Sequence, residues 1–211
     1  MKQKYYIFIS AILFTLVSGS LLNCQSNEEK NRQLAVQKIN EANELKKQAI
    51  LFDDSLHKKE KLYEALNLVD EAIKLDPNNE IAYSQKISIY GEFKDYKMIL
   101  HILEDLKSKK GEYPELVLFQ GMFLAKLHEK EEAKQKFIKA LDLYLQRIKS
   151  DTSTIFYDRI NIAYLYMFLD EKEKSQNEFD QMEKDYPSKK ATVDYEREML
   201  LEFEWDKYFE K

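Results

Sequence analysis

The chain has 211 residues, a length that fits one domain or a small pair of domains. Charged residues make up 34% and hydrophobic residues 44%, with a formal net charge of −5, which excludes a disordered chain and a protein with several membrane spans. With only 4 glycines and 3 prolines, the chain lacks the turn residues of a β-sandwich, a β-barrel or a glycine-looped α/β enzyme, so its composition predicts an all-α fold.

The N-terminal segment predicts export from the cytoplasm. Lys2 and Lys4 precede an uncharged, largely apolar run over residues 5–22, and Cys24 follows two residues later. A basic start, an apolar stretch and a small-residue exit are the parts of a secretory signal. An uncleaved anchor is the alternative, because a helix of this length spans roughly 27 Å, close to the hydrocarbon thickness of a bilayer. Both alternatives place the rest of the chain outside the cytoplasm.

The segment Leu21-Leu22-Asn23-Cys24 resembles a bacterial lipobox, with Asn23 where that motif usually has Gly, Ala or Ser. The resemblance implies that residues 1–23 are a lipoprotein signal peptide and that Cys24 carries the acyl chains, palmitate among them, that attach the protein to a membrane. It implies a lipid-anchored protein of the bacterial cell envelope, outside the cytoplasm. Gln25 after the cysteine is compatible with forwarding to the outer membrane. Residues 24–32 are then expected to form a short polar tether.

Small and large residues recur along the following segment with a spacing of 34 residues or a multiple of it. A small residue is followed after four positions by a large one in three places: Ala65 and Val69, Ala133 and Phe137, Ser175 and Phe179. Ala133 comes 68 residues after Ala65, and Ala163 comes 42 after Gly121, which is 34 plus an insertion of eight near Ser150. The pattern predicts antiparallel helix pairs in which small residues let the backbones approach closely.

The three prolines fit the same arrangement. Pro77 and Pro187 are expected just after the second helix of a pair, because proline cannot continue a helix. Pro114 suits the first turn of a helix. No proline is therefore expected inside a helix.

The segment from Tyr63 to Asn79, with Ala65, Ala72 and Pro77, is similar to the second helix and turn of a tetratricopeptide repeat (TPR). The resemblance implies a right-handed α-solenoid of antiparallel helix pairs over residues 33–189, closed by a C-terminal capping helix over residues 190–211. The second repeat departs from the pattern, with Ile87 and Ile99 where small residues are expected. The repeats are expected at residues 34–79, 80–113, 114–147 and 156–189.

The chain carries no recognisable catalytic or metal-binding motif. Its 3 histidines are scattered, its glycines are too few for a phosphate-binding loop or a dinucleotide fingerprint, and Cys24 is the only cysteine. We therefore expect no enzyme activity, no cofactor and no metal. The acidic net charge predicts no nucleic acid among its partners.

The TPR resemblance implies a protein or peptide partner in a concave groove lined by the first helix of each pair. In the third and fourth repeats the implied groove positions are apolar or aromatic: Leu118, Met122, Ile160, Tyr164, Met167 and Phe168. The Lys and Asn set with which some TPR domains hold a C-terminal carboxylate is absent from the implied positions. Two alternatives stay open at this point: the groove binds a partner, or the chain's own C-terminal segment folds into the groove and buries it. That segment carries Met199, Leu200, Phe203, Trp205, Tyr208 and Phe209. Trp205 and Phe209 exceed what one helix face needs and favour an additional contact, such as a second copy of the chain in a homo-dimer.

The combined expectation is a membrane-anchored envelope lipoprotein whose TPR solenoid serves as a protein–protein interaction adaptor or assembly scaffold. The alternative is an accessory module that captures a ligand or glycan for an envelope uptake system. The 188 residues that follow residue 23 leave no room for the insertions that such capture would need.

Overall fold

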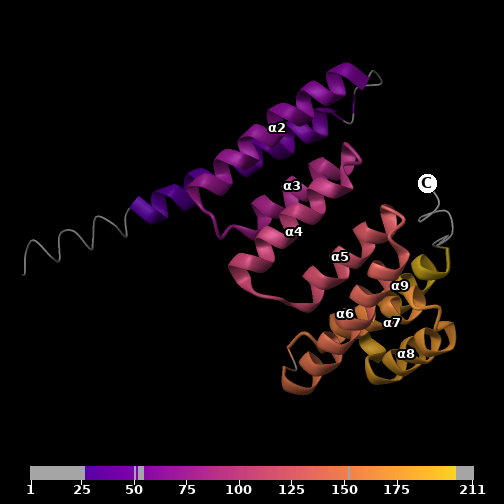
Figure 1. The fold of residues 1–211 in the computed structure, drawn as a ribbon. Coiled ribbons are helices and arrows are strands. Elements are labelled where there is room, and N and C mark those ends of the chain that lie inside the picture. The colour runs from indigo at the N-terminus through magenta and orange to yellow at the C-terminus, as the bar shows by residue number, and fades with distance from the viewer. Residues whose placement is uncertain (1–26, 50, 52–54, 152, 203–211) are drawn as a thin grey trace, which may run out of the picture. The chain divides into compact units, whose positions relative to one another are not determined.

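The computed structural model describes residues 27–49, 51, 55–151 and 153–202. These residues form helices joined by short turns and contain no strand, so the predicted all-α fold is confirmed (Figure 1). The expected signal peptide, Cys24 and the aromatic C-terminal residues 203–211 lie outside the described residues. None of the described helices combines the length and the apolar character that crossing a membrane requires. The chain divides into two compact units, Met1–Phe93 and Lys94–Lys211.

The first unit consists of a helix over residues 27–49, followed by α2 (Ser55–Leu75) and α3 (Glu80–Glu92). The first two run antiparallel and side by side (Figure 1). Their interface is rich in alanine, which lets the helices pack closely; the fully buried alanines are Ala35, Ala49, Ala65 and Ala72. α2 ends before Pro77, and the side chain of Asn79 accepts a hydrogen bond from the Ala82 backbone N–H at 3.2 Å to cap α3.

Residues 27–32, which the sequence analysis placed in the polar tether, are helical and continue into the helix over residues 27–49. Residues 27–49 contain neither Gly nor Pro, so nothing in this segment interrupts a helix.

The second unit contains six α-helices and one short 3₁₀ turn among its described residues: α4 (Tyr96–Lys110), α5 (Pro114–Lys126), α6 (Lys130–Ser150), α7 (Ile155–Phe168), α8 (Lys172–Asp185), η1 (Pro187–Lys189) and α9 (Lys190–Glu202). From α4 to α9 each helix packs against the one that follows it in the chain, and α9 also contacts α7 (Figure 1). Pro114 lies in the first turn of α5 and Pro187 follows α8, as predicted. This order of contacts is that of a TPR-like stack of helix pairs, while its handedness stays a prediction.

Three turns of this unit share one backbone conformation, which recurs along the chain at the predicted spacing. Lys94, His128 and Asp170 have positive φ angles of 56°, 64° and 61°, and each lies two residues before the start of α4, α6 or α8. They are separated by 34 and 42 residues, which reproduces the predicted period and its insertion of eight. The left-handed residue lets the chain reverse direction at once, as in a helix C-terminal motif.

Small residues hold α5 and α6 close together. A Cβ atom built on Gly121 of α5 would lie 2.6 Å from Cε1 of Phe137 in α6, closer than real Cβ atoms approach a neighbour. The glycine therefore lets the Phe137 ring of α6 approach the α5 backbone closely. In the next pair, Ala163 of α7 and Ser175 of α8 are both buried.

The eight-residue insertion that the sequence places near Ser150 lengthens helix α6 and not only the loop that follows it. α6 has 21 residues, whereas α4 has 15 and α8 has 14. The additional turns carry Tyr144 and Arg147 to the start of α7, where Arg147 meets Asp158. This extension supplies one side of the cavity described next.

Candidate functional site

A cavity of about 350 Å³ opens in the second unit between α5 and α7, both of which pack against α6. Its walls are mainly aromatic and aliphatic, and the polar groups come from Glu115, Asn161 and two tyrosines. The lining residues are Glu115, Leu118, Phe119, Met122, Tyr144, Asn161, Tyr164 and Phe168. Apart from the adjacent pair Leu118 and Phe119, successive lining residues within α5 and within α7 are three or four positions apart, so each helix offers one face. The volume lies within the range of pockets that bind small ligands or side chains.

Four of the six predicted groove residues meet in this cavity, namely Leu118, Met122, Tyr164 and Phe168. The other two, Ile160 and Met167, do not line it. They belong to the apolar cluster that α7 forms with α8 and α9, where Ile160 is buried.

Four lining residues were missed by the sequence analysis. Glu115 lies three positions before Leu118 and Asn161 three before Tyr164, so the helical period alone could have found both. Phe119 is also a neighbour of Leu118 in sequence. Tyr144 comes from α6, the second helix of its pair, and no groove position of the repeat pattern points to it.

An ion-pair network fixes the polar end of the cavity. The Arg147 guanidinium donates from Nε to Asp158 Oδ2 at 2.9 Å and from Nη1 to Glu115 Oε2 at 3.1 Å, with further bonds from Nη2 to both carboxylates. Thr154 Oγ1 donates to Asp158 Oδ2 at 2.8 Å. Hydrogen bonds to Asp158 and then to Glu115 raise the pKa of Arg147, which stays charged. The network joins α5, α6 and α7 and holds Glu115 at the cavity.

The two tyrosines of the cavity differ in burial and in the hydrogen bonds that their hydroxyl groups make. Tyr164 donates from its hydroxyl to Glu196 Oε2 of α9 at 2.9 Å, and burial followed by this bond raises the pKa of Tyr164. Tyr144 is fully buried, and burial together with the Glu115 charge raises its pKa. Within the described part of the chain the Tyr144 hydroxyl makes no hydrogen bond of acceptable geometry.

The aromatic walls differ in how freely a partner could reach them. Phe119 is 46% exposed, so its ring is accessible. Phe168 lies edge-on to the buried Phe137, with ring centroids 5.0 Å apart, and therefore also supports the core. Tyr164 and Phe168 meet edge-on at 6.2 Å. A substitution at Phe119 tests the cavity with the least disturbance of the fold.

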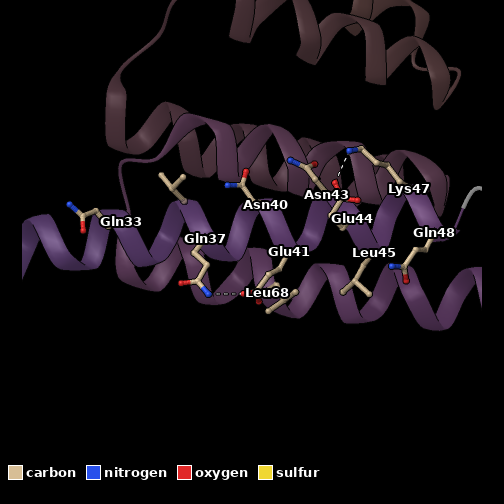
Figure 2. Close-up of a pocket in the computed structure, with 11 residues that line it drawn as sticks. Gln33, Gln37, Asn40, Glu41, Asn43, Glu44, Leu45, Lys47, Gln48 and Leu68 are labelled. Carbon is tan, nitrogen blue, oxygen red and sulfur yellow. Dashed lines mark hydrogen bonds and ion pairs between the residues drawn. The ribbon is translucent and has the colours of Figure 1, made fainter.

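A second hollow lies in the first unit, along the outer face of the helix over residues 27–49 (Figure 2). Figure 2 shows that its labelled side chains come from this helix except for Leu68 of α2, and most are amides or charged. Such a polar face suits the terminal helix of a stack, which must face water. No aromatic side chain lines this hollow, so the second unit offers the stronger binding site.

The described residues bring no three His, Cys, Asp or Glu side chains together in a way that could hold a metal ion. The described carboxylates of the cavity, Glu115 and its network partner Asp158, are instead bound by Arg147.

Comparison with known proteins adds little to this geometry. No family model matches the chain, and no curated protein matches it. Among solved structures, MamA (residues 41 to the end) from Desulfovibrio magneticus RS-1 is similar at 20% sequence identity, with 84% of this chain and 96% of that chain covered. The TM-score is 0.40, which is too low to support an argument about shared fold or function.

Proposed function

We propose that this protein is a membrane-anchored interaction scaffold of the bacterial cell envelope, whose TPR-like second unit binds a segment of a partner protein. The single observation that carries the proposal is the aromatic cavity between α5 and α7. It lies on the helices whose inner faces the TPR resemblance assigns to partner binding.

The chemistry of the cavity suits a peptide better than it suits catalysis. Accessible aromatic rings such as Phe119 are the side chains that most often dominate the energy of an interface. The flexible thioether of Met122 can adapt to partners of varied shape. The Glu115 carboxylate is already held by two guanidinium nitrogens, which leaves it poorly placed to act as a general base.

The anchoring part of the proposal depends on Cys24 and its neighbours. If Cys24 is acylated, only two residues separate it from residue 27, which is helical. Three extended residues reach about 10 Å, so the first unit would lie directly at the membrane surface. The polar outer face of that helix is compatible with a position next to lipid headgroups and water.

Exchange of Cys24 for serine tests the anchor. Cells that express the wild-type chain and take up radiolabelled palmitate should label the product and keep it in the membrane fraction, whereas Cys24→Ser should lose the label and leave the membrane. An unlabelled wild type that stays in the membrane would instead establish the uncleaved anchor over residues 5–22. Cytosolic wild type would contradict both.

A crosslinking pull-down tests the scaffold. Detergent-solubilised envelopes should yield a specific protein with the wild-type chain, and Phe119→Ala should reduce its recovery about tenfold, as expected for an aromatic hot spot of roughly 1.4 kcal/mol or more. Tyr157→Ala is the matched control, because Tyr157 is an exposed aromatic residue of the same unit that does not line the cavity. Equal recovery with Phe119→Ala would exclude this cavity as the partner site. Retention on a glycan column without protein prey would favour the capture module.

A further inference from the structure

The cavity combines an aromatic wall with a polar end, and the polar end carries excess negative charge. Glu115 lines the cavity and Glu196 accepts a hydrogen bond from the lining residue Tyr164, while Asp158 shares Arg147 with Glu115 just behind the lining. Among the described residues, Arg147 is the cation that pairs with Glu115 and Asp158, so these three negative charges are accompanied by one positive charge. The cavity lining itself contains no Lys or Arg.

We propose that the cavity recognises an arginine side chain presented by an otherwise apolar segment of the partner protein. This inference rests on the proposed function and specifies the chemistry of the bound segment. The guanidinium would lie at the Glu115 end, and the apolar neighbours of the arginine would lie against Phe119 and Met122.

Charge favours this occupant over an uncharged one. A purely apolar side chain placed over Glu115 would remove water from a carboxylate and return no hydrogen bond, which is costly. A guanidinium would compensate the excess charge and restore hydrogen bonds. The Glu115 side chain keeps 37% of its surface exposed beside Arg147, so a second cation can still reach it.

The acceptors at the polar end match a guanidinium better than an ammonium group. The polar end offers the Glu115 carboxylate and the side-chain amide oxygen of Asn161 as acceptors. Arginine offers five N–H donors in a planar fork, whereas lysine offers three from one point. The rings of Phe119, Tyr164 and Phe168 can contact the cation through their faces.

The same charges argue against the chain's own C-terminal segment as the occupant. Residues 203–211 carry three acidic side chains and two lysines, and they contain no arginine. An acidic segment would add repulsion to a cavity that is already negative. The open alternative of self-covering is therefore an outcome to be tested.

Titration calorimetry with the full chain in detergent micelles tests the proposal. The probes are acetylated, amidated pentapeptides of sequence Ala-Leu-X-Leu-Ala, in which X is arginine, lysine, norleucine or glutamate, and a peptide that copies residues 203–211. The arginine peptide should bind about tenfold more tightly than the norleucine peptide at low salt, the lysine peptide should lie between them, and added salt should reduce the difference.

Variants then assign the preference to the cavity. Glu115→Gln should reduce the arginine affinity about fivefold and leave the norleucine affinity unchanged, and Phe119→Leu should weaken both peptides. The matched controls are Glu173→Gln, an exposed carboxylate at the start of α8, and Tyr157→Leu; both should bind as the wild type does.

The remaining outcomes overturn the inference in distinguishable ways. Equal binding of the norleucine and arginine peptides, sensitive to Phe119→Leu, would exclude the charge preference and leave the proposed scaffold function standing. Tight binding of the peptide that copies residues 203–211 would assign the cavity to the chain itself. No binding of any peptide would overturn the inference, and the envelope pull-down would then decide on the scaffold function separately.

Discussion

Replacement of Gly121 by valine should lower the free energy of unfolding by about 3 kcal/mol, because overpacking of a well-filled interface costs this much. A Cβ atom at this position would already lie 2.6 Å from the ring of Phe137, and valine adds two methyl groups. The ring cannot easily withdraw, since Phe137 is buried and lies edge-on to Phe168. Chemical denaturation followed by far-UV circular dichroism measures the loss.

Gly91→Val is the matched control for this prediction. Gly91 is also a helical glycine, but no atom lies within 4 Å of its built Cβ, so the change should alter stability by less than about 1 kcal/mol. Equal losses of unfolding free energy in the two variants would show that the loss comes from helix propensity and not from the contact with Phe137. A double variant that adds Phe137→Leu should recover part of the loss, with a coupling of about 1 kcal/mol or more.

Packing at Gly121 should also affect binding. Displacement of Phe137 moves Phe168, which forms part of the cavity wall. Gly121→Val should therefore weaken partner recovery in the pull-down even at a temperature where the variant is folded. Normal recovery with a folded variant would indicate that Phe168 contributes to the core alone.

Arg147→Met should lower the free energy of unfolding by about 3 kcal/mol, because it leaves a buried carboxylate without its counter-ion. The Asp158 side chain is only 2% exposed, and Thr154 would remain as its side-chain hydrogen-bond donor among the described residues. Methionine keeps much of the length and apolar contact of the arginine, so the loss of unfolding free energy comes mainly from removal of the positive charge. Urea unfolding monitored by circular dichroism measures it.

Lys139→Met is the control for the loss of an ion pair on the same helix. Lys139 pairs with Glu112 but keeps 52% of its side-chain surface exposed, and exposed pairs contribute less than about 1 kcal/mol. A second test adds Asp158→Asn to Arg147→Met, which removes the unpaired charge and should restore more than about 1 kcal/mol. If the double variant were no more stable than Arg147→Met, burial of the Asp158 charge would not be the cause.

The regular part of the fold could be predicted because its signals are local. Pro114 at the start of α5 and the prolines after α2 and α8 mark helix ends through backbone chemistry that needs no tertiary contact. The recurrence of a small residue before a large one, as in Ala133 and Phe137, gave the phase of the helix pairs. The helical conformation of residues 27–32 was missed, since a polar sequence is compatible both with a tether and with an exposed helical turn.

The cavity could be predicted only in part. The helical period placed Leu118, Met122, Tyr164 and Phe168 on the inner faces of their helices, and these four do meet. The distance between α5 and α7 determines which other residues line the cavity. The side chains packed between each of these helices and α6 set that distance. Tyr144 and Arg147 join the site for this reason.

The sequence by itself determined that the chain is helical, that its helices come in pairs with a 34-residue phase, and that apolar side chains gather on the inner faces of α5 and α7. These properties follow from periodicity and from the backbone limits of proline and glycine. Only the tertiary structure decided that an extended α6 brings Arg147 between Glu115 and Asp158 and leaves the Tyr144 hydroxyl buried beside a cavity. Charges and hydrogen bonds act over a few ångströms, so their balance exists only after residues distant in sequence have been packed together.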